Sequence, residues 1–257
     1  MNLVIGNGLI GRNLYYYLRR MGNAVILGRD VVSLDGTDWD LPESDVAYIC
    51  AAETSTEKCE RYPEETRRIN VDGTIRLAEK LKGFVVWLSS ERVFDGSKAS
   101  RNVNDAVCPT TEYGRQKAGI ERILLDMGVT VIRLSKVLGY DVPLFEGWIT
   151  DLKGGRTIYP YSNMSMSPMS VHFVSDILYK IGRDRMGGLL QVSGDSDLTY
   201  DRIAYHFANY IGVDLSLVNP VEAEIGHPNT TLESDFDQPD SWETIYGWCR
   251  DFSTKAR

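Results

Sequence analysis

The sequence contains little cysteine and little histidine, with four and three of these residues among 257. The cysteines, at positions 50, 59, 108 and 249, form no C-x-x-C pair. No cluster of His and Cys has the spacing of a metal site either. We therefore expect no metal ion and no disulfide framework, and we expect the thiols to lie in a reducing compartment.

Long apolar runs and basic patches are also missing. No stretch approaches the ~18 apolar residues that a membrane helix needs, and the start, MNLVIGNG, does not resemble a signal peptide. The 28 Lys and Arg residues are dispersed among 36 Asp and Glu, which gives a net charge of −8. Nucleic-acid phosphates require a basic patch. The sequence predicts a cytoplasmic protein without membrane or nucleic-acid partners, although a small anionic ligand stays allowed.

A glycine turn follows the first apolar run, residues 3–5, and precedes a helix-like segment at 14–21 and a second strand at 24–27. Strand, glycine turn and helix are the context that a G-x-G-x-x-G motif requires. Its first glycine permits the tight turn, the second lets the backbone approach a pyrophosphate, and the third lets the helix pack on the strand. The sequence therefore predicts a dinucleotide site at the helix amides. Its residues are Gly6, Asn7, Gly8, Leu9, Ile10 and Gly11.

The end of the second strand usually selects the cofactor. An acidic residue there binds the ribose hydroxyls of NAD, whereas a basic residue suits the 2′-phosphate of NADP. Here the strand runs into Gly28-Arg29-Asp30. Arg29 favours NADP, with NAD as the second choice. The alternative is that Arg29 is merely solvated and that Asp30 or Asp35 binds the ribose.

Three more strands are predicted at 46–50, 84–88 and 129–134, with a helix over 63–81. Ala51 and Ala52 follow the third strand and leave space for a flat ligand against the backbone. Asn70, inside the predicted helix, is expected to be a polar core residue that ties the sheet to the helix. The alternation of strands and helices predicts an α/β fold, a doubly wound parallel sheet of the NAD(P)-binding Rossmann type.

The alternation weakens in the second half of the chain. We predict that residues 1–138 form the NAD(P)-binding domain and that residues 139–257 form a smaller substrate-binding lobe, which can be interleaved with the first. Within this lobe the pattern predicts a strand at 156–159 and a mobile Met/Ser-rich loop at 162–170. Helices are expected at 145–152, 174–181 and 200–210, and a strand at 189–192.

A Ser, a Tyr and a Lys in the middle of the chain could together donate a proton to a carbonyl. Ser89 and Ser90 end the fourth strand, at the edge where ligands bind in open α/β sheets. Tyr113 and Lys117 are four residues apart, so they share one face of a helix. The charge of Lys117 is expected to lower the pKa of the Tyr113 hydroxyl. The alternative is a buried Ser beside a solvated Tyr/Lys pair.

Several motifs carry a family resemblance. Residues 89–96, SSERVFDG, are similar to S-T-D-Y-V-F-D-G, and residues 109–117 are similar to P-x-x-x-Y-G-x-x-K. Residues 51–54, AAET, are similar to A-A-Y-T, and residues 227–232, HPNTTL, to R-P-x-N-S-x-L. Over nearly its whole length the chain thus resembles the extended short-chain dehydrogenase/reductase superfamily, and within it the dTDP-4-dehydrorhamnose reductases.

The resemblance implies roles for individual residues. Ser90, rather than Ser89, would hydrogen-bond the substrate carbonyl, and Tyr113 would protonate its oxygen as hydride arrives from the nicotinamide. Lys117 would bind the nicotinamide ribose, and Glu91 takes the place of an Asp near the reacting carbonyl. These roles imply an NAD(P)H-dependent reductase of a keto-sugar nucleotide. A homodimer is common among such proteins.

The chain departs from the family pattern at several positions. Its glycine motif is one residue shorter than G-x-x-G-x-x-G. Arg92 replaces a Tyr, at a position where dehydratases of this type carry a Glu, so dehydration is disfavoured. Lys136 replaces a Trp that faces the sugar, which leaves the substrate open.

The sugar's diphosphate needs cationic partners, and Lys136, Arg156 and Arg202 are the candidates. Three alternatives to the reductase also stay open. They are a sugar-nucleotide epimerase, a non-catalytic NAD(P)-binding regulatory subunit, and a reductase of a carbonyl that is not a sugar.

Overall fold

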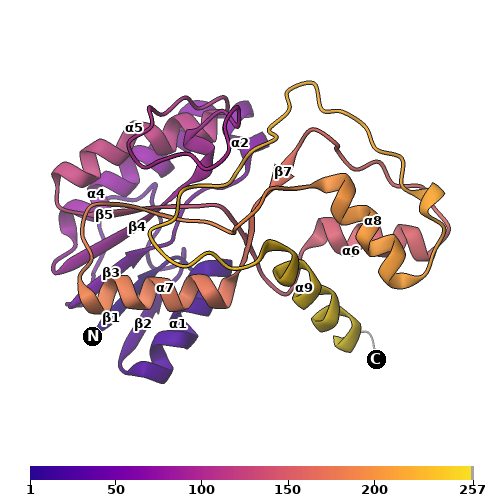
Figure 1. Ribbon diagram of the computed structural model, residues 1–257. Helices are drawn as coiled ribbons and strands as arrows, with labels where there is room; N and C mark the ends of the chain where they lie inside the picture. The colour runs from indigo at the N-terminus through magenta and orange to yellow at the C-terminus, as the bar shows by residue number, and fades with distance from the viewer. Residues whose placement is uncertain (256–257) are drawn as a thin grey trace.

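A parallel six-stranded sheet with the order β2-β1-β3-β4-β5-β9 forms the centre of the fold (Figure 1). The computed structural model describes residues 1–255. Strand order reverses between β1 and β3, so the ends of these two strands border the crevice where ligands bind in such sheets. The predicted α/β Rossmann fold is confirmed. The strands are β1 (Asn2–Ile5), β2 (Ala24–Leu27), β3 (Val46–Ile49), β4 (Phe84–Ser90), β5 (Thr130–Leu134) and β9 (Leu189–Val192).

Helices cover both faces of the sheet because successive strand residues point to opposite sides. On one face, α1 (Leu9–Met21) and α7 (Val171–Asp184) pack on Val4, Tyr48 and Val86. On the other, α4 (Thr74–Lys80) and α5 (Glu112–Asp126) pack on Leu3, Ala47 and Trp87. Both faces are therefore apolar, which explains the near-continuous hydrophobic strands.

The helix predicted over 63–81 is interrupted. The structure has α3 (Pro63–Arg67), a π-helical turn η1 (Arg68–Gly73) and then α4. The extra residue in the π-turn directs Asn70 inward. Its Oδ1 accepts the Glu53 N–H (2.8 Å) and its Nδ2 donates to Gln116 Oε1 (2.8 Å). The prediction that Asn70 is a polar core residue is confirmed, and it ties the loop after β3 to α5.

The prediction of a mobile loop at 162–170 is wrong. This segment holds β7 (Ser165–Met166) and β8 (Pro168–Ser170), and Met166 and Met169 are buried. β8 pairs with β6 (Lys136–Leu138), and β7 pairs with β10 (Leu198–Thr199). Met169 packs in the apolar cluster beneath α1 and α7, and Met166 packs in the cluster of the three helices described below, so the Ser-rich composition was misleading. The strand predicted at 156–159 is reduced to one bridge, between Ile158 and Val218.

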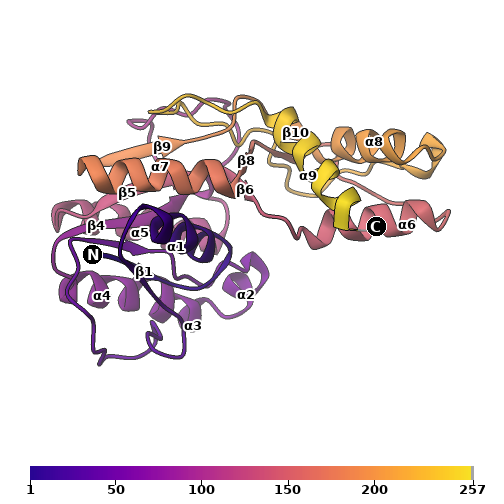
Figure 2. The ribbon, with the colours of Figure 1, turned by 90° about the horizontal axis from the view of Figure 1, so that it is seen from below.

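Three helices gather beside the sheet (Figures 1 and 2). They are α6 (Pro143–Lys153), α8 (Tyr200–Ile211) and α9 (Ser241–Lys255). Aromatic side chains contribute to the core between them. The ring of Phe145 lies edge-on to Phe207 and Trp248, with centroids 4.9 and 5.1 Å away. The chain returns to the sheet after residue 138 through α7 and β9, and the division at that residue stays a prediction. Short helical segments complete the chain: α2 (Thr56–Arg61), η2 (Glu91–Val93) and η3 (Leu215–Leu217).

None of the helices within residues 1–255 combines the length and the apolar character that crossing a bilayer requires.

A buried ionic network joins the sheet to α5. Arg133 of β5 and Glu121 of α5 form an ion pair (2.6 Å between Nη2 and Oε2), with side chains only 3% and 6% exposed. Ser89 donates its hydroxyl to Glu121 (2.6 Å), and Arg133 Nη1 donates to Gln191 Oε1 (3.2 Å). Gln191 Nε2 in turn reaches the carbonyl oxygen of Arg101 (2.8 Å). The network therefore connects three strands, a helix and an irregular segment.

Removal of one charge from this network should be strongly destabilising. We expect Glu121→Gln to lower the free energy of unfolding by about 3–5 kcal/mol, because the Arg133 charge stays buried without a partner. The matched control is Asp126→Asn, on the same helix, whose surface pair with Arg122 should contribute about 0.3–0.5 kcal/mol. Urea denaturation of both variants measures the difference. Similar small losses would contradict the importance of the buried pair.

Candidate active site

The glycine turn is shaped by close backbone contacts. Gly6 has a φ of +106°, and a Cβ there would lie 2.6 Å from the Ala51 nitrogen. A Cβ on Gly11 would lie 1.9 Å from the Gly6 oxygen, so α1 could not pack as closely. Gly8 has no atom within 4 Å of its Cβ position, which leaves its backbone open. The tight turn at Gly6 and the close packing at Gly11 are thus present, whereas the approach of a pyrophosphate to Gly8 stays a prediction.

The start of α1 is suited to an anion. No side chain caps it at Gly8, and its first turn carries no acidic residue. The N–H groups there lack intrahelical partners and carry the positive end of the helix dipole. A cavity of about 430 Å³, here called the glycine-turn cavity, adjoins them. It is lined by the whole turn, Gly6 to Gly11, by Arg29 and Asp35, and by Ala51 and Ala52.

Arg29 and Asp35 both face the glycine-turn cavity, whereas Asp30 does not line it. The Ser33 hydroxyl donates to Asp35, and this hydrogen bond holds the pKa of the carboxyl below its usual value. Arg29 forms no hydrogen bond or ion pair within residues 1–255. The guanidinium of Arg29 is therefore a charged group of this cavity that has no hydrogen-bond partner among these residues.

The two serines have different partners. Both are the last residues of β4, rather than following it. Ser89 is committed to Glu121 through the hydrogen bond described above. Ser90 donates to the Glu91 carboxylate (2.7 Å) and accepts the Arg92 N–H (3.2 Å). Both serines line the same cavity, but only the partners of Ser90, Glu91 and Arg92, line it as well. The choice of Ser90 over Ser89 as the functional serine stays a prediction.

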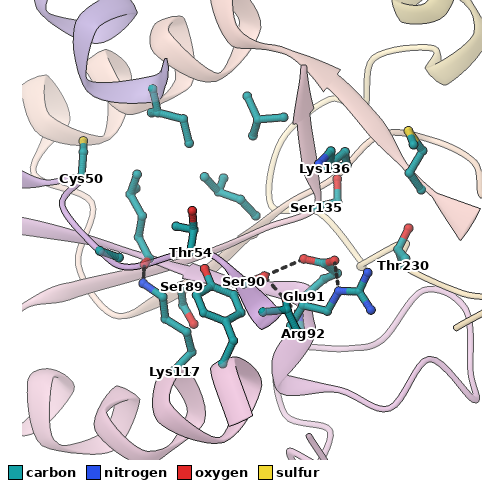
Figure 3. A pocket seen from close by; sticks show the side chains of 18 of the residues that line it. Cys50, Thr54, Ser89, Ser90, Glu91, Arg92, Lys117, Ser135, Lys136 and Thr230 are labelled. Atoms are coloured by element: carbon teal, nitrogen blue, oxygen red, sulfur yellow. Dashed lines mark hydrogen bonds and ion pairs between the residues drawn. The ribbon is translucent and has the colours of Figure 1, made fainter. Parts of the chain in front are cut away.

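Tyr113 and Lys117 lie near the start of α5. Thr111 caps this helix by accepting the Gly114 N–H (3.1 Å), which makes Tyr113 its second residue. Lys117 is only 4% exposed, and its Nζ donates to the Leu88 carbonyl oxygen (2.7 Å), as Figure 3 shows. The same ammonium lies 4.4 Å from the Trp87 ring centroid and 5.7 Å from that of Tyr113.

Ser90, Tyr113 and Lys117 line one cavity of about 320 Å³, here called the serine–tyrosine cavity. It adjoins the glycine-turn cavity, and the two share part of their walls. The shared residues are Ile10, Cys50, Ala51, Ala52, Thr54 and Val137.

Burial controls the titration of both helix residues. It raises the pKa of Tyr113, with the Glu91 charge adding to the effect and a hydrogen bond with Ser90 opposing it. Burial also lowers the pKa of Lys117 to about 8, and Glu121 offsets part of this shift. The expectation that Lys117 lowers the pKa of Tyr113 is therefore wrong. The Lys117 ammonium is directed to the Leu88 carbonyl and the Trp87 ring. Desolvation of the Tyr113 hydroxyl is therefore the largest contribution to the shift of its pKa.

Charged side chains gather at the same cavity. Glu91 pairs with Arg92 (3.3 Å between Oε1 and Nε), and Lys136 enters from β6 (Figure 3). The other two candidates for the diphosphate line neither of the two cavities. Arg156 pairs with Asp151 (2.7 Å), and Arg202 lies over the Trp242 ring. Of the three cations, only Lys136 is therefore placed to meet a ligand here.

The sequence did not point to several residues that line this cavity. Ser165, Met166, Tyr200 and Thr230 come from β7, α8 and the segment after it. Ser165, Met166 and Tyr200 lie in no recognisable sequence motif. They reach the cavity through the folding of distant segments, such as the pairing of β7 with β10. Thr230 lay inside the family-like segment 227–232, which was the one available signal. Across residues 1–255 no group of His, Cys, Asp and Glu is arranged to hold a metal ion.

Comparisons with known proteins bear on this site. A Haloferax volcanii protein named "Probable low-salt glycan biosynthesis reductase Agl14" is 27% identical over 252 residues, which cover 86% of this chain and 84% of that protein. Methionine adenosyltransferase 2 subunit beta of Bos taurus is 25% identical over 192 residues, covering 68% of this chain and 57% of that protein.

Among solved structures, dTDP-4-dehydrorhamnose reductase from Bacillus anthracis, in complex with NADP, superimposes with a TM-score of 0.85. The two chains are 16% identical, and the match covers 97% of this one and 98% of that one. This likeness shows the shared fold. The family model described as "RmlD substrate binding domain" matches residues 1–230. The chain therefore belongs to the RmlD substrate binding domain family, which confirms the resemblance to dTDP-4-dehydrorhamnose reductases.

Proposed function

We propose that the chain is an NADPH-dependent reductase of a keto-sugar nucleotide. The observation that carries this proposal is the junction of the two cavities. One offers a glycine turn and uncapped helix amides to a dinucleotide, and the other offers Ser90, Tyr113 and Lys117 to a carbonyl. Two relatives named as reductases, one of them solved with NADP, support the same activity.

The glycine-turn cavity fits a dinucleotide by the nature of its groups. The α1 amides would bind the diphosphate, Arg29 would meet the 2′-phosphate, and Ala51 and Ala52 would leave room for the flat ring. Lys117, which lines the serine–tyrosine cavity, would bind the nicotinamide ribose. When bound, the reduced nicotinamide supplies the hydride that carbonyl reduction needs.

The proton would come from Tyr113. The hydroxyl is protonated at neutral pH, since burial raises its pKa rather than lowering it, and it would act as the general acid. Ser90 would hold the carbonyl oxygen by a hydrogen bond, with Glu91 fixing the serine hydroxyl. Once the proton has left, the charge of Arg92, which opposes the rise in the pKa of Tyr113, would stabilise the tyrosinate. The reduction of the carbonyl thus needs no acid besides Tyr113.

A second candidate is a non-catalytic NAD(P)-binding subunit. The match to methionine adenosyltransferase 2 subunit beta favours it, since that protein is named as a subunit of an enzyme. Turnover separates the two functions. Tight cofactor binding without oxidation of NADPH by any of a panel of 4-keto nucleotide sugars would favour the subunit, and conversion between sugar isomers without net oxidation would indicate an epimerase.

Replacement of the proton donor tests the proposed chemistry. We expect Tyr113→Phe to lower kcat for NADPH oxidation by about 10²-fold or more, because the acid is removed, while NADPH binding changes little. The exposed Tyr16 of α1 provides the control, and Tyr16→Phe should behave as the wild type. Loss of nicotinamide absorbance measures the rate. Unchanged turnover in Tyr113→Phe would show that another group protonates the carbonyl.

Replacement of Arg29 tests the cofactor choice. We expect Arg29→Ala to weaken NADPH binding about 10- to 100-fold, the value of a charged hydrogen bond, and to leave NADH binding nearly unchanged. Arg20→Ala, at the far end of α1, is the matched control. Fluorescence titration with each cofactor gives the dissociation constants. Equal losses for both cofactors would exclude recognition of the 2′-phosphate by Arg29.

The buried Lys117 should make stability depend on pH. Its pKa falls from 10.5 to about 8 in the folded protein, so between these values the unfolded chain holds a proton that the folded chain has lost. Stability therefore rises with pH through this window, by at most about 3 kcal/mol. Urea denaturation at pH 7 and pH 10 should show this rise in the wild type relative to Lys117→Met. A difference that does not change with pH would refute the shifted pKa.

A further inference from the structure

Three polar groups on one side of the serine–tyrosine cavity have unused hydrogen-bonding capacity. They are the guanidinium of Arg92, the ammonium of Lys136 and the hydroxyl of Ser165, here called the cationic wall. They come from η2, β6 and β7, and none of them lines the glycine-turn cavity. The cationic wall is therefore directed to the substrate side of the site.

Arg92 is only partly satisfied. Its Nε pairs with Glu91 (3.3 Å), and its side chain is 25% exposed. Its two terminal nitrogens make no hydrogen bond with any of the residues 1–255. These nitrogens form the planar fork that matches a carboxylate or a phosphate. Its charge also reaches across the cavity, since it opposes the rise in the pKa of Tyr200 that burial causes.

Lys136 is held in place by its backbone. It pairs with Pro168 as the first residue of β6, and the preceding Ser135 donates its hydroxyl to the Ser167 carbonyl oxygen (2.7 Å). Its ammonium has no carboxylate partner within the described part of the chain. Figure 3 shows Lys136 and Arg92 entering the same pocket from different segments. Two cations thus face one cavity, where Glu91, the partner of the Arg92 Nε, is the one carboxylate of the lining.

Ser165 adds an independent sign of a missing partner. It is 1% exposed, and its Oγ has no hydrogen-bond partner in the protein. A buried hydroxyl without a partner costs free energy. A ligand acceptor in the cavity would remove this cost.

The charges at the cavity favour an anion. Its lining includes three cations, Arg92, Lys117 and Lys136, and only one carboxylate, Glu91. The chain as a whole has a net charge of −8, so this concentration of positive charge is local. A ligand that offers only sugar hydroxyls would not require this local positive charge.

We propose that the cationic wall binds a carboxylate carried by the sugar ring, so that the substrate is an acidic keto-sugar nucleotide. This inference rests on the proposed function and narrows its substrate. The other anion on such a ligand is the diphosphate, which is attached to the anomeric carbon. Arg92 follows Ser90 by two residues and shares Glu91 with it. The guanidinium therefore lies beside the carbonyl site, where a ring substituent is nearer than the diphosphate.

Matched nucleotide sugars separate the two anions. The wild type, saturated with NADP⁺, would be titrated calorimetrically with UDP-glucose and UDP-glucuronate, and with the corresponding dTDP pair. The members of each pair share the diphosphate and differ in one carboxylate. We expect the glucuronate to bind about 10-fold or more tightly than the glucose compound, for whichever nucleotide binds.

Lys136→Gln should bring this ratio of affinities close to one. Lys153→Gln, which removes an exposed charge from α6, is the control and should keep the wild-type ratio. Equal affinities in the wild type would overturn the inference and leave the proposed function standing. Equal weakening of both members by Lys136→Gln would assign the wall to the diphosphate and also overturn it. If no nucleotide sugar binds, the proposed function itself fails.

Discussion

The buried carboxylate of Glu121 is the constraint on which the candidate active site depends. It is fixed by two donors from the sheet, Arg133 and Ser89, and it lies one helical turn after Lys117. The helix that carries Tyr113 and Lys117 is thereby locked to β4 and β5, the strands beside it. Desolvation of an ion pair is costly and is offset only when the remaining donors and acceptors are satisfied. Here the hydrogen bonds of Arg133 to Gln191 and to the Val103 carbonyl oxygen meet that condition.

The burial of α5 also shifts the pKa values of Tyr113 and Lys117 in opposite directions. Tyr113 holds its proton more firmly than a free tyrosine, and Lys117 holds its proton less firmly than a free lysine. Glu91 contributes to this separation, because its charge raises the pKa of Tyr113 and its carboxylate orients Ser90.

Local patterns in the sequence predicted the sheet, the glycine turn and the placement of Tyr113 and Lys117, because each depends on residues that are neighbours in the chain. The contact between Gly11 and the Gly6 oxygen and the cap at Thr111 are of this kind. Features that depend on distant partners were missed. The π-turn around Asn70 reflects its contacts with Glu53 and Gln116, and Ser165 reaches the cavity only through strand pairing. The pKa of Tyr113 was misjudged because spacing reveals a neighbouring charge but not the extent of burial.

The path of the chain between the sheet and the three-helix group affects how the site could open. The chain leaves the sheet at β6, returns through α7 and β9, leaves again at α8 and comes back near Leu232 and Asp235 before α9 (Figure 1). Two bodies joined by a single linker can swing freely about it, whereas bodies joined by several crossing segments must bend all of them together. The serine–tyrosine cavity can therefore widen only by a small shear or tilt of the three-helix group against the sheet. A substrate would therefore have to enter the serine–tyrosine cavity without a large separation of the two parts.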